Sequence, residues 1–151
     1  VLFSHPSGHY GTTMAESSLG NGINPDSSRD MSGDGAAFYW VAYFWYLPNA
    51  ITIDSAHVLM SVNGALGQGL NYHLMSYDID TGNGATSGDL SDGTVLADGG
   101  TTSGVDYNAV DYQSLTIQSS DVVAGKVVLA TVESTGTAVT SVNMSIKYHI
   151  Q

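Results

Sequence analysis

The hydrophobic and polar residues near the end of the chain alternate with a period of two. Successive side chains of a β-strand point to opposite faces, so this alternation predicts a strand with one face in a core and one in water. The predicted core face consists of Val142, Met144, Ile146, Tyr148 and Ile150, and the predicted wet face of Ser141, Asn143, Ser145, Lys147 and His149.

The segment before this strand has a different pattern. From Val127 to Val132 nearly every position is apolar or β-branched, which is typical of a strand buried on both faces. Residues 134–137, Ser-Thr-Gly-Thr, separate the two segments. A short link that contains Gly predicts a hairpin connection between them.

Residues 38–47 form a stretch of mostly Phe, Tyr and Trp that ends before Pro48. Aromatic residues favour strands, and both faces of this one would be large. We expect one face in the core and the other against a subunit or the N-terminal arm. A sugar-binding platform is the less favoured alternative, since Tyr and Trp are enriched at both kinds of contact.

The rest of the chain predicts short strands and turns. We expect strands at 51–54, 56–62, 70–79 and 94–97, and one or two strands over 105–117, where Leu115 and Ile117 are in phase. Loops or turns are expected at 63–69, 81–93, 98–104 and 119–125. A helical period is absent. The chain is therefore expected to be all-β, as a single jelly-roll-like β-sandwich over residues 36–151, with another Greek-key sandwich as the alternative. Residues 1–35 show no hydrophobic period, which predicts a loop-rich N-terminal arm.

Composition narrows the possible partners. The chain has 151 residues, 42% of them hydrophobic, and no Cys, so we expect one domain with a packed core and no disulfide. Lys and Arg total 3 against 14 Asp and Glu, which gives a formal charge of −11. Nucleic acids and anionic membrane surfaces require basic patches, so neither is expected as a partner. The longest apolar run, 36–48, is too short for a transmembrane helix.

The densest group of oxygen donors lies between residues 78 and 92. Asp78 and Asp80 have the spacing that opens a calcium loop, and Asp89 stands where the last ligand would come. Asn83 occupies the position that needs Gly, and Asp89 replaces the usual Glu. Calcium at these three residues is therefore a weak candidate against an ordinary acidic turn, and no other cofactor is expected.

Histidine and catalytic patterns give little support for an enzyme. His5 and His9 have helical metal spacing, but Pro6 and Gly8 argue against a helix there. The other histidines, at 57, 73 and 149, lie in predicted strands and are read as single polar side chains. Motifs for a nucleophile elbow, a zinc protease or a phosphate loop are absent, so a non-enzymatic protein is expected.

The closing segments resemble those of small β-sandwich virion proteins of tailed bacteriophages. The resemblance rests on residues 115–133 with their Asp121-Val-Val-Ala-Gly125 turn, on the final Lys147-Tyr-His149 strand, and on residues 75–80 and 88–93, roughly half of the chain. It implies a capsid decoration (cement) protein or a related appendage subunit. These proteins are commonly trimeric and have no catalytic residues to transfer.

The resemblance and the residue patterns together predict a structural role on the outer capsid surface. A homotrimer would bind the major capsid protein and stabilise the shell by linking neighbouring subunits. The expected contact residues lie in the arm and the aromatic strand, at Phe3, Tyr10, Tyr39, Tyr43 and Trp45. The alternative is a glycan-binding or receptor-binding sandwich of a tail fibre or secreted adhesin, which would use exposed aromatic residues.

Overall fold

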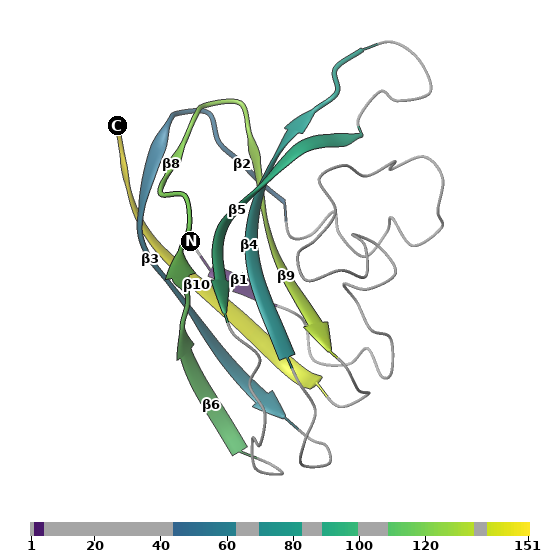
Figure 1. Ribbon diagram of the computed structural model, residues 1–151, viewed down its shortest axis with the longest axis vertical. Coiled ribbons are helices and arrows are strands. Elements are labelled where there is room, and N and C mark those ends of the chain that lie inside the picture. Colours follow the sequence, from purple (N-terminus) through teal and green to yellow (C-terminus); the bar gives the residue numbers. More distant parts are fainter. Residues whose placement is uncertain (1, 5–43, 63–69, 83–88, 100–108, 135–138) are drawn as a thin grey trace.

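The computed structural model describes residues 2–4, 44–62, 70–82, 89–99, 109–134 and 139–151 (Figure 1). These residues form antiparallel strands joined by turns and bends, and none of them is helical. The all-β class expected from the sequence is confirmed. Across these ranges, no helix has the length and hydropathy that crossing a bilayer would require.

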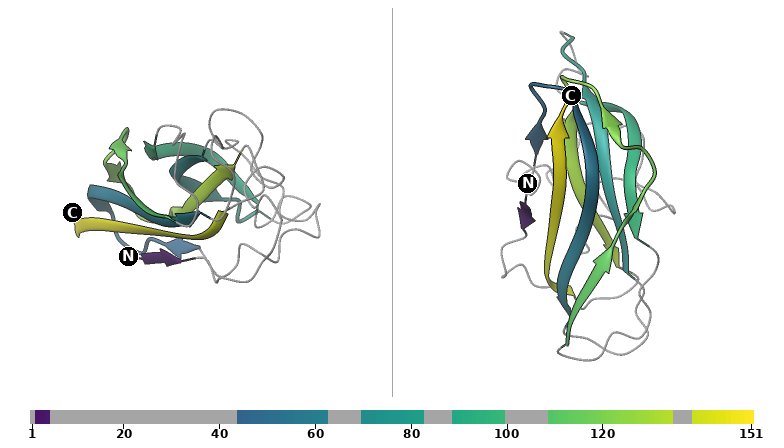
Figure 2. Two further views of the ribbon diagram at one scale, coloured as in Figure 1. Left: turned by 90° about the horizontal axis from the view of Figure 1, so that it is seen from below. Right: turned by 90° about the vertical axis from the view of Figure 1, so that its left-hand side faces the viewer.

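Sheet A contains the strand that was predicted from the alternating pattern at the end of the chain. Its path is β1 (Leu2–Ser4), β10 (Val139–Ile150), β3 (Ile51–Val62) and β6 (Ala109–Ser114), and β8 (Asp121–Val122) also pairs with β3. The two long strands, β3 and β10, lie side by side, with Ile51 opposite Ile150 and Val58 opposite Met144. The right-hand view of Figure 2 shows this pair as a blue and a yellow ribbon.

Sheet B contains the strand that was expected to be buried on both faces. Its order is β2 (Trp45–Tyr46), β9 (Val127–Ser134), β4 (Leu70–Ile79), β5 (Leu90–Gly99) and β7 (Thr116–Ile117). In β9 the prediction is confirmed, because Val127, Val128 and Leu129 are all buried. The turn before it contains Gly125, whose φ of 89° lies in the left-handed region that favours Gly.

One main core joins the two sheets. It contains residues from β3 and β10 of sheet A and from β4, β5 and β9 of sheet B, with additional members from the connecting segments. Burial of these apolar side chains is the main driving force for the association of the sheets. The buried members include Ile53, Val58, Tyr72, Leu74, Leu96, Val128, Met144 and Ile146.

The segment from β6 to β8 ties the sheets together at one side. It pairs with β3 in sheet A, then with β5 in sheet B through β7, and then returns to β3 through β8. Leu115, at the first crossing, is buried, and its amide donates to the carbonyl of Ala56. Trp45 of sheet B packs against Tyr148 of sheet A, with ring centroids 4.9 Å apart, and provides a second contact between the sheets.

A bulge in β3 explains why two strands were expected there. Lys147 of β10 pairs with Ser55, but the next residue, Tyr148, pairs with Ile53, so Asp54 has no opposing residue. An extra residue changes which positions face the core. Ile51 and Ile53 are buried before the bulge, and Ala56 and Val58 are buried after it.

Other elements differ from the predictions at their ends. β4 has the predicted bounds, but β5 begins at Leu90, inside the segment that was predicted to be a loop, and β8 lies in the predicted turn before β9. Asp92, with a positive φ of 49°, stands where the pairing of β5 with β4 changes register. The jelly-roll-like sandwich and the division into an arm and one domain stay predictions.

Candidate binding surface

The contact residues predicted from the sequence are only partly covered by the structure. Trp45 is half-buried and packs against the main core, and Phe3 lies in β1, whose backbone pairs with β10. Tyr10, Tyr39 and Tyr43 lie outside the described residues. At the end of the aromatic stretch, the structure therefore places Trp45 toward the core.

The neighbour of Trp45 points the other way. Tyr46 is 55% exposed, although its backbone pairs with Val127 of β9. Ile150 and Val123 are each 63% exposed, and their segments lie at the same end of the molecule, in the upper left of Figure 1. The strands meet there, since Val122 and Ile150 both pair with Ile51, and Gly125 donates to the carbonyl of Leu47. We call Tyr46, Val123 and Ile150 the apolar end.

Ile150 belonged to the predicted core face of the last strand. The alternation is confirmed at Met144 and Ile146, which are buried, and at Ser145, Lys147 and His149, which are exposed. The prediction is wrong for Ile150, which is 63% exposed although its cross-strand partner Ile51 is buried. Among the described residues, β1 covers the other side of β10 only at residues 143–145, so Ile150 lies at an edge of the sheet. The pattern of a strand predicts the direction of a side chain, but it does not predict how far the opposing sheet extends.

The three carboxylates of the calcium candidate have different environments. Asp78 forms an ion pair with Lys126, with Oδ2 2.8 Å from Nζ. Asp80 accepts a hydrogen bond from the amide of Gly82 through Oδ1, at 2.8 Å, as in an ordinary Asx turn. Asp89 is buried, and its carbonyl accepts from the amide of Asp80. Within the described ranges, no three His, Asp or Glu side chains are grouped so that they could hold a metal ion.

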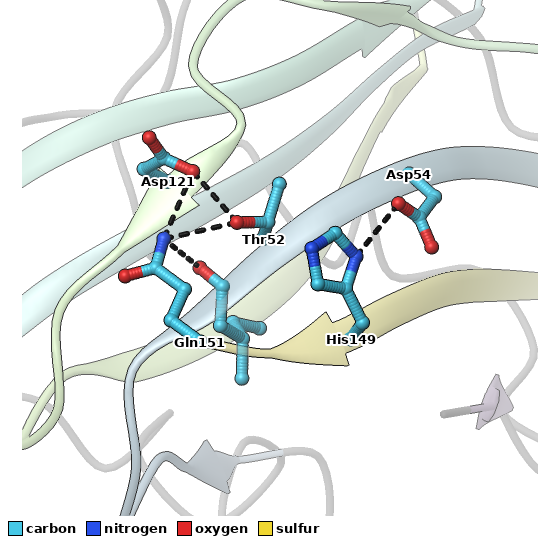
Figure 3. Close-up of polar contacts among 6 residues, drawn as sticks. Thr52, Asp54, Asp121, His149 and Gln151 are labelled. Atoms are coloured by element: carbon cyan, nitrogen blue, oxygen red, sulfur yellow. Dashed lines mark hydrogen bonds and ion pairs between the residues drawn. The ribbon is translucent and has the colours of Figure 1, made fainter.

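The outer face of sheet A carries a polar group where β3, β8 and β10 meet (Figure 3). Thr52 Oγ1 donates to Asp121 Oδ1 at 2.8 Å, and the side-chain amide of Gln151 donates to that same oxygen at 3.0 Å. Beside them, His149 Nδ1 lies 2.9 Å from Oδ1 of Asp54, the extra residue of the bulge. These exposed side chains join three strands, so their direct effect is to hold the strand ends in register.

A second group on the same face combines polar and apolar side chains. The rings of His57 and Tyr112 are stacked, with centroids 5.4 Å apart and an interplanar angle of 18°. His57 Nδ1 and Ser114 Oγ share a hydrogen bond of 3.2 Å. Tyr112 is 61% exposed, and Leu59, which pairs with it across the strands, is 47% exposed. Two large apolar side chains therefore lie next to each other on an open sheet face.

The sequence did not single out this second group. The segment 105–117 was predicted as one or two strands with Leu115 and Ile117 in phase, but no role was predicted for Tyr112. Gln113 and Leu115 are less exposed than Tyr112 and Ser114, so the strand does alternate. The alternation could have predicted that Tyr112 faces water. It could not have predicted that β3, which contains His57 and Leu59, is the partner strand.

The histidines of the predicted strands do not converge. His57 and His149 lie on the outer face of sheet A in separate cross-strand rows, opposite Ser114 and Thr52 respectively. His73 is buried in sheet B, where it pairs with Thr131. The reading of these residues as single polar side chains is consistent with this placement.

Comparison with protein families and with curated proteins gives no match. No protein-family model matches the chain, and no curated protein matches it significantly. The chain's own geometry and sequence are therefore the basis for any assignment of function.

Proposed function

We propose that this protein is a non-enzymatic structural protein of a virion, a capsid decoration protein that binds the outer shell as a homotrimer. The major capsid protein would be its partner. The sequence support is the resemblance of residues 115–133 and 142–149 to the closing strands of phage virion sandwiches. The acidic composition is consistent with a position outside the shell, away from packaged nucleic acid.

The observation that carries the proposal is the apolar end. Tyr46, Val123 and Ile150 expose more than half of their surface at one end of the all-β body. Large apolar side chains that gather on a surface mark contacts with other proteins. Burying them against capsid subunits would contribute about 25 cal/mol for each Å² of apolar surface removed from water. A subunit that contacts two neighbours in this way stabilises the shell by mass action.

The first test is the copy number of the protein in purified particles, measured by quantitative mass spectrometry against the major capsid protein. Copies in proportion to the capsid lattice are the expected result. A few copies per particle would contradict a decoration role and indicate a tail or vertex component. Absence from particles would overturn the virion assignment itself.

The second test uses variants of the apolar end. The triple variant Tyr46→Ser, Val123→Ser and Ile150→Ser should keep the fold, because all three side chains are mostly exposed, but should lose binding to particles that lack the protein. The matched control is Leu59→Ser with Tyr112→Ser, which removes exposed apolar side chains from the outer face of sheet A. If the control loses particle binding and the triple variant keeps it, the apolar end is not the contact.

A further inference from the structure

We propose that the outer face of sheet A contains a binding site for a neutral saccharide, centred on the ring of Tyr112. This inference does not depend on the virion role, because it concerns a surface that the apolar end does not include. It also differs from the sugar platform considered for residues 38–47, where Trp45 packs toward the core.

The site is laid out in two rows across three strands. One row contains Ser145, His57 and Ser114, and the next contains Asn143, Leu59 and Tyr112, from β10, β3 and β6 in each case. Neighbouring strands are about 4.8 Å apart, and alternate residues of a strand are about 7 Å apart. The two rows therefore cover an area about 10 Å by 7 Å, which is comparable to one or two sugar rings.

The central aromatic ring is oriented by a neighbouring ring. His57 stacks on Tyr112 at 5.4 Å, and its Nδ1 is fixed by the hydrogen bond to Ser114 Oγ. A ring that is already oriented loses little conformational entropy when a ligand packs on it. Tyr112 is nevertheless 61% exposed, so much of its surface is accessible to a ligand.

The side chains around the ring select the chemical class of the ligand. None of the six residues is an acid, a Lys or an Arg; the polar ones offer hydroxyl, amide and imidazole groups. Within these two rows an ionic ligand finds no charged partner, although Lys147 lies in the next row of β10, and the net charge of −11 repels anions such as nucleic acids. A sugar ring has an apolar C–H face, which can pack on Tyr112 and Leu59, and hydroxyl groups at its edge, which can bond Ser and Asn side chains.

The test measures binding of the full chain to immobilised neutral oligosaccharides, namely cellohexaose, maltohexaose, chitohexaose and a mannan fragment, with heparin as the anionic comparison. Retention on at least one neutral probe and none on heparin is expected. Tyr112→Ala should weaken the binding about tenfold, which corresponds to the loss of one aromatic stacking contact. Retention on no neutral probe, or on heparin alone, would overturn the proposal.

Two variants separate the site from general effects of the protein. Tyr46→Ala removes a tyrosine of similar exposure, 55% against 61%, at the apolar end and should leave saccharide binding unchanged. His57 is a positioning residue, so His57→Ala should weaken binding less than Tyr112→Ala, and His57→Phe, which can still stack, should restore it. Equal binding by wild type and Tyr112→Ala, with both proteins folded by circular dichroism, would contradict the site.

Discussion

The outer faces of the two sheets differ in how much of their side-chain surface is exposed to water. The outer face of sheet A carries exposed residues, including Leu59, Tyr112 and His149. On sheet B, the face opposite to the main core carries a second apolar cluster, and its members Met75, Tyr77 and Leu129 are almost fully buried. Phe44, Ile79 and Val95 pack against that cluster.

This difference assigns the two outer faces to different roles, stability for sheet B and ligand binding for sheet A. Sheet B is buried on both faces, which explains the continuous apolar sequence of β9, whereas sheet A is buried on one face and its last strand alternates. A face inside a core contributes to the free energy of unfolding and is closed to ligands. The outer face of sheet A is open, so its side chains are available for binding.

The largest expected effect compares one leucine on each outer face. Leu129→Ala should lower the free energy of unfolding by about 2–5 kcal/mol, because Leu129 is 1% exposed and its removal leaves a cavity. The matched change, Leu59→Ala, should cost about 0.5 kcal/mol or less, because Leu59 is 47% exposed. Urea unfolding followed by circular dichroism measures both. Equal costs would mean that the two faces do not differ in burial.

The next effect compares neighbours in the aromatic stretch. Trp45→Ala should cost about 2 kcal/mol, since it removes a half-buried ring that packs on Tyr148 between the two sheets. Tyr46→Ala should cost about 0.5 kcal/mol, because its side chain points into water. The two thermal midpoints give the comparison. A larger loss for Tyr46→Ala would show that the strand is oriented the other way.

A smaller effect is expected for the ion pair of sheet B. Lys126 is only 17% exposed, so Asp78→Asn leaves a partly buried ammonium group without its carboxylate. We expect a loss of about 1 kcal/mol, measured by chemical denaturation. Asp92→Asn is not a suitable control, because the positive φ of Asp92 introduces a backbone effect. Asp54→Asn, in the exposed pair of sheet A, is the matched change and should cost less.

The smallest effect is expected for that pair in sheet A. His149 and Asp54 are 60% and 34% exposed, so water and salt screen their interaction. A double-mutant cycle with His149→Ala and Asp54→Ala should give a coupling free energy of about 0.5 kcal/mol or less. A coupling above that of Asp78 with Lys126 would reverse the expected order of the two faces.

The sequence predicted the fold most successfully where one face of a strand is dry and the other is wet. Alternation located β10 within one residue of its start, and the apolar run located β9. It failed at the edge of a sheet, where Ile150 is exposed beside the buried Ile51, and where a bulge changes the phase, as at Asp54. These features depend on the partner strand, and a single segment contains no information about its partner.

The candidate binding surface was less predictable from the sequence than the fold. The stacking of His57 on Tyr112 joins residues from strands that are separated by β4 and β5 in the sequence. Neither residue belongs to a motif, and each is unremarkable alone. The emphasis on aromatic residues was reasonable, but the predicted contact residue Trp45 packs against the core. Two exposed tyrosines, Tyr46 in the same stretch and Tyr112 in β6, were not among the predicted contacts.

The pairing of β3 with β10 has a consequence for how the protein forms in the cell. Ile51 pairs with Ile150, so the first long strand of sheet A meets its main partner only after all other strands have been synthesised. Contacts between residues so distant in sequence close slowly, because a long loop must be ordered first. During translation, β3 would therefore expose an unpaired hydrogen-bonding edge for longer than β4, and chaperone binding to the nascent chain should be concentrated on β3.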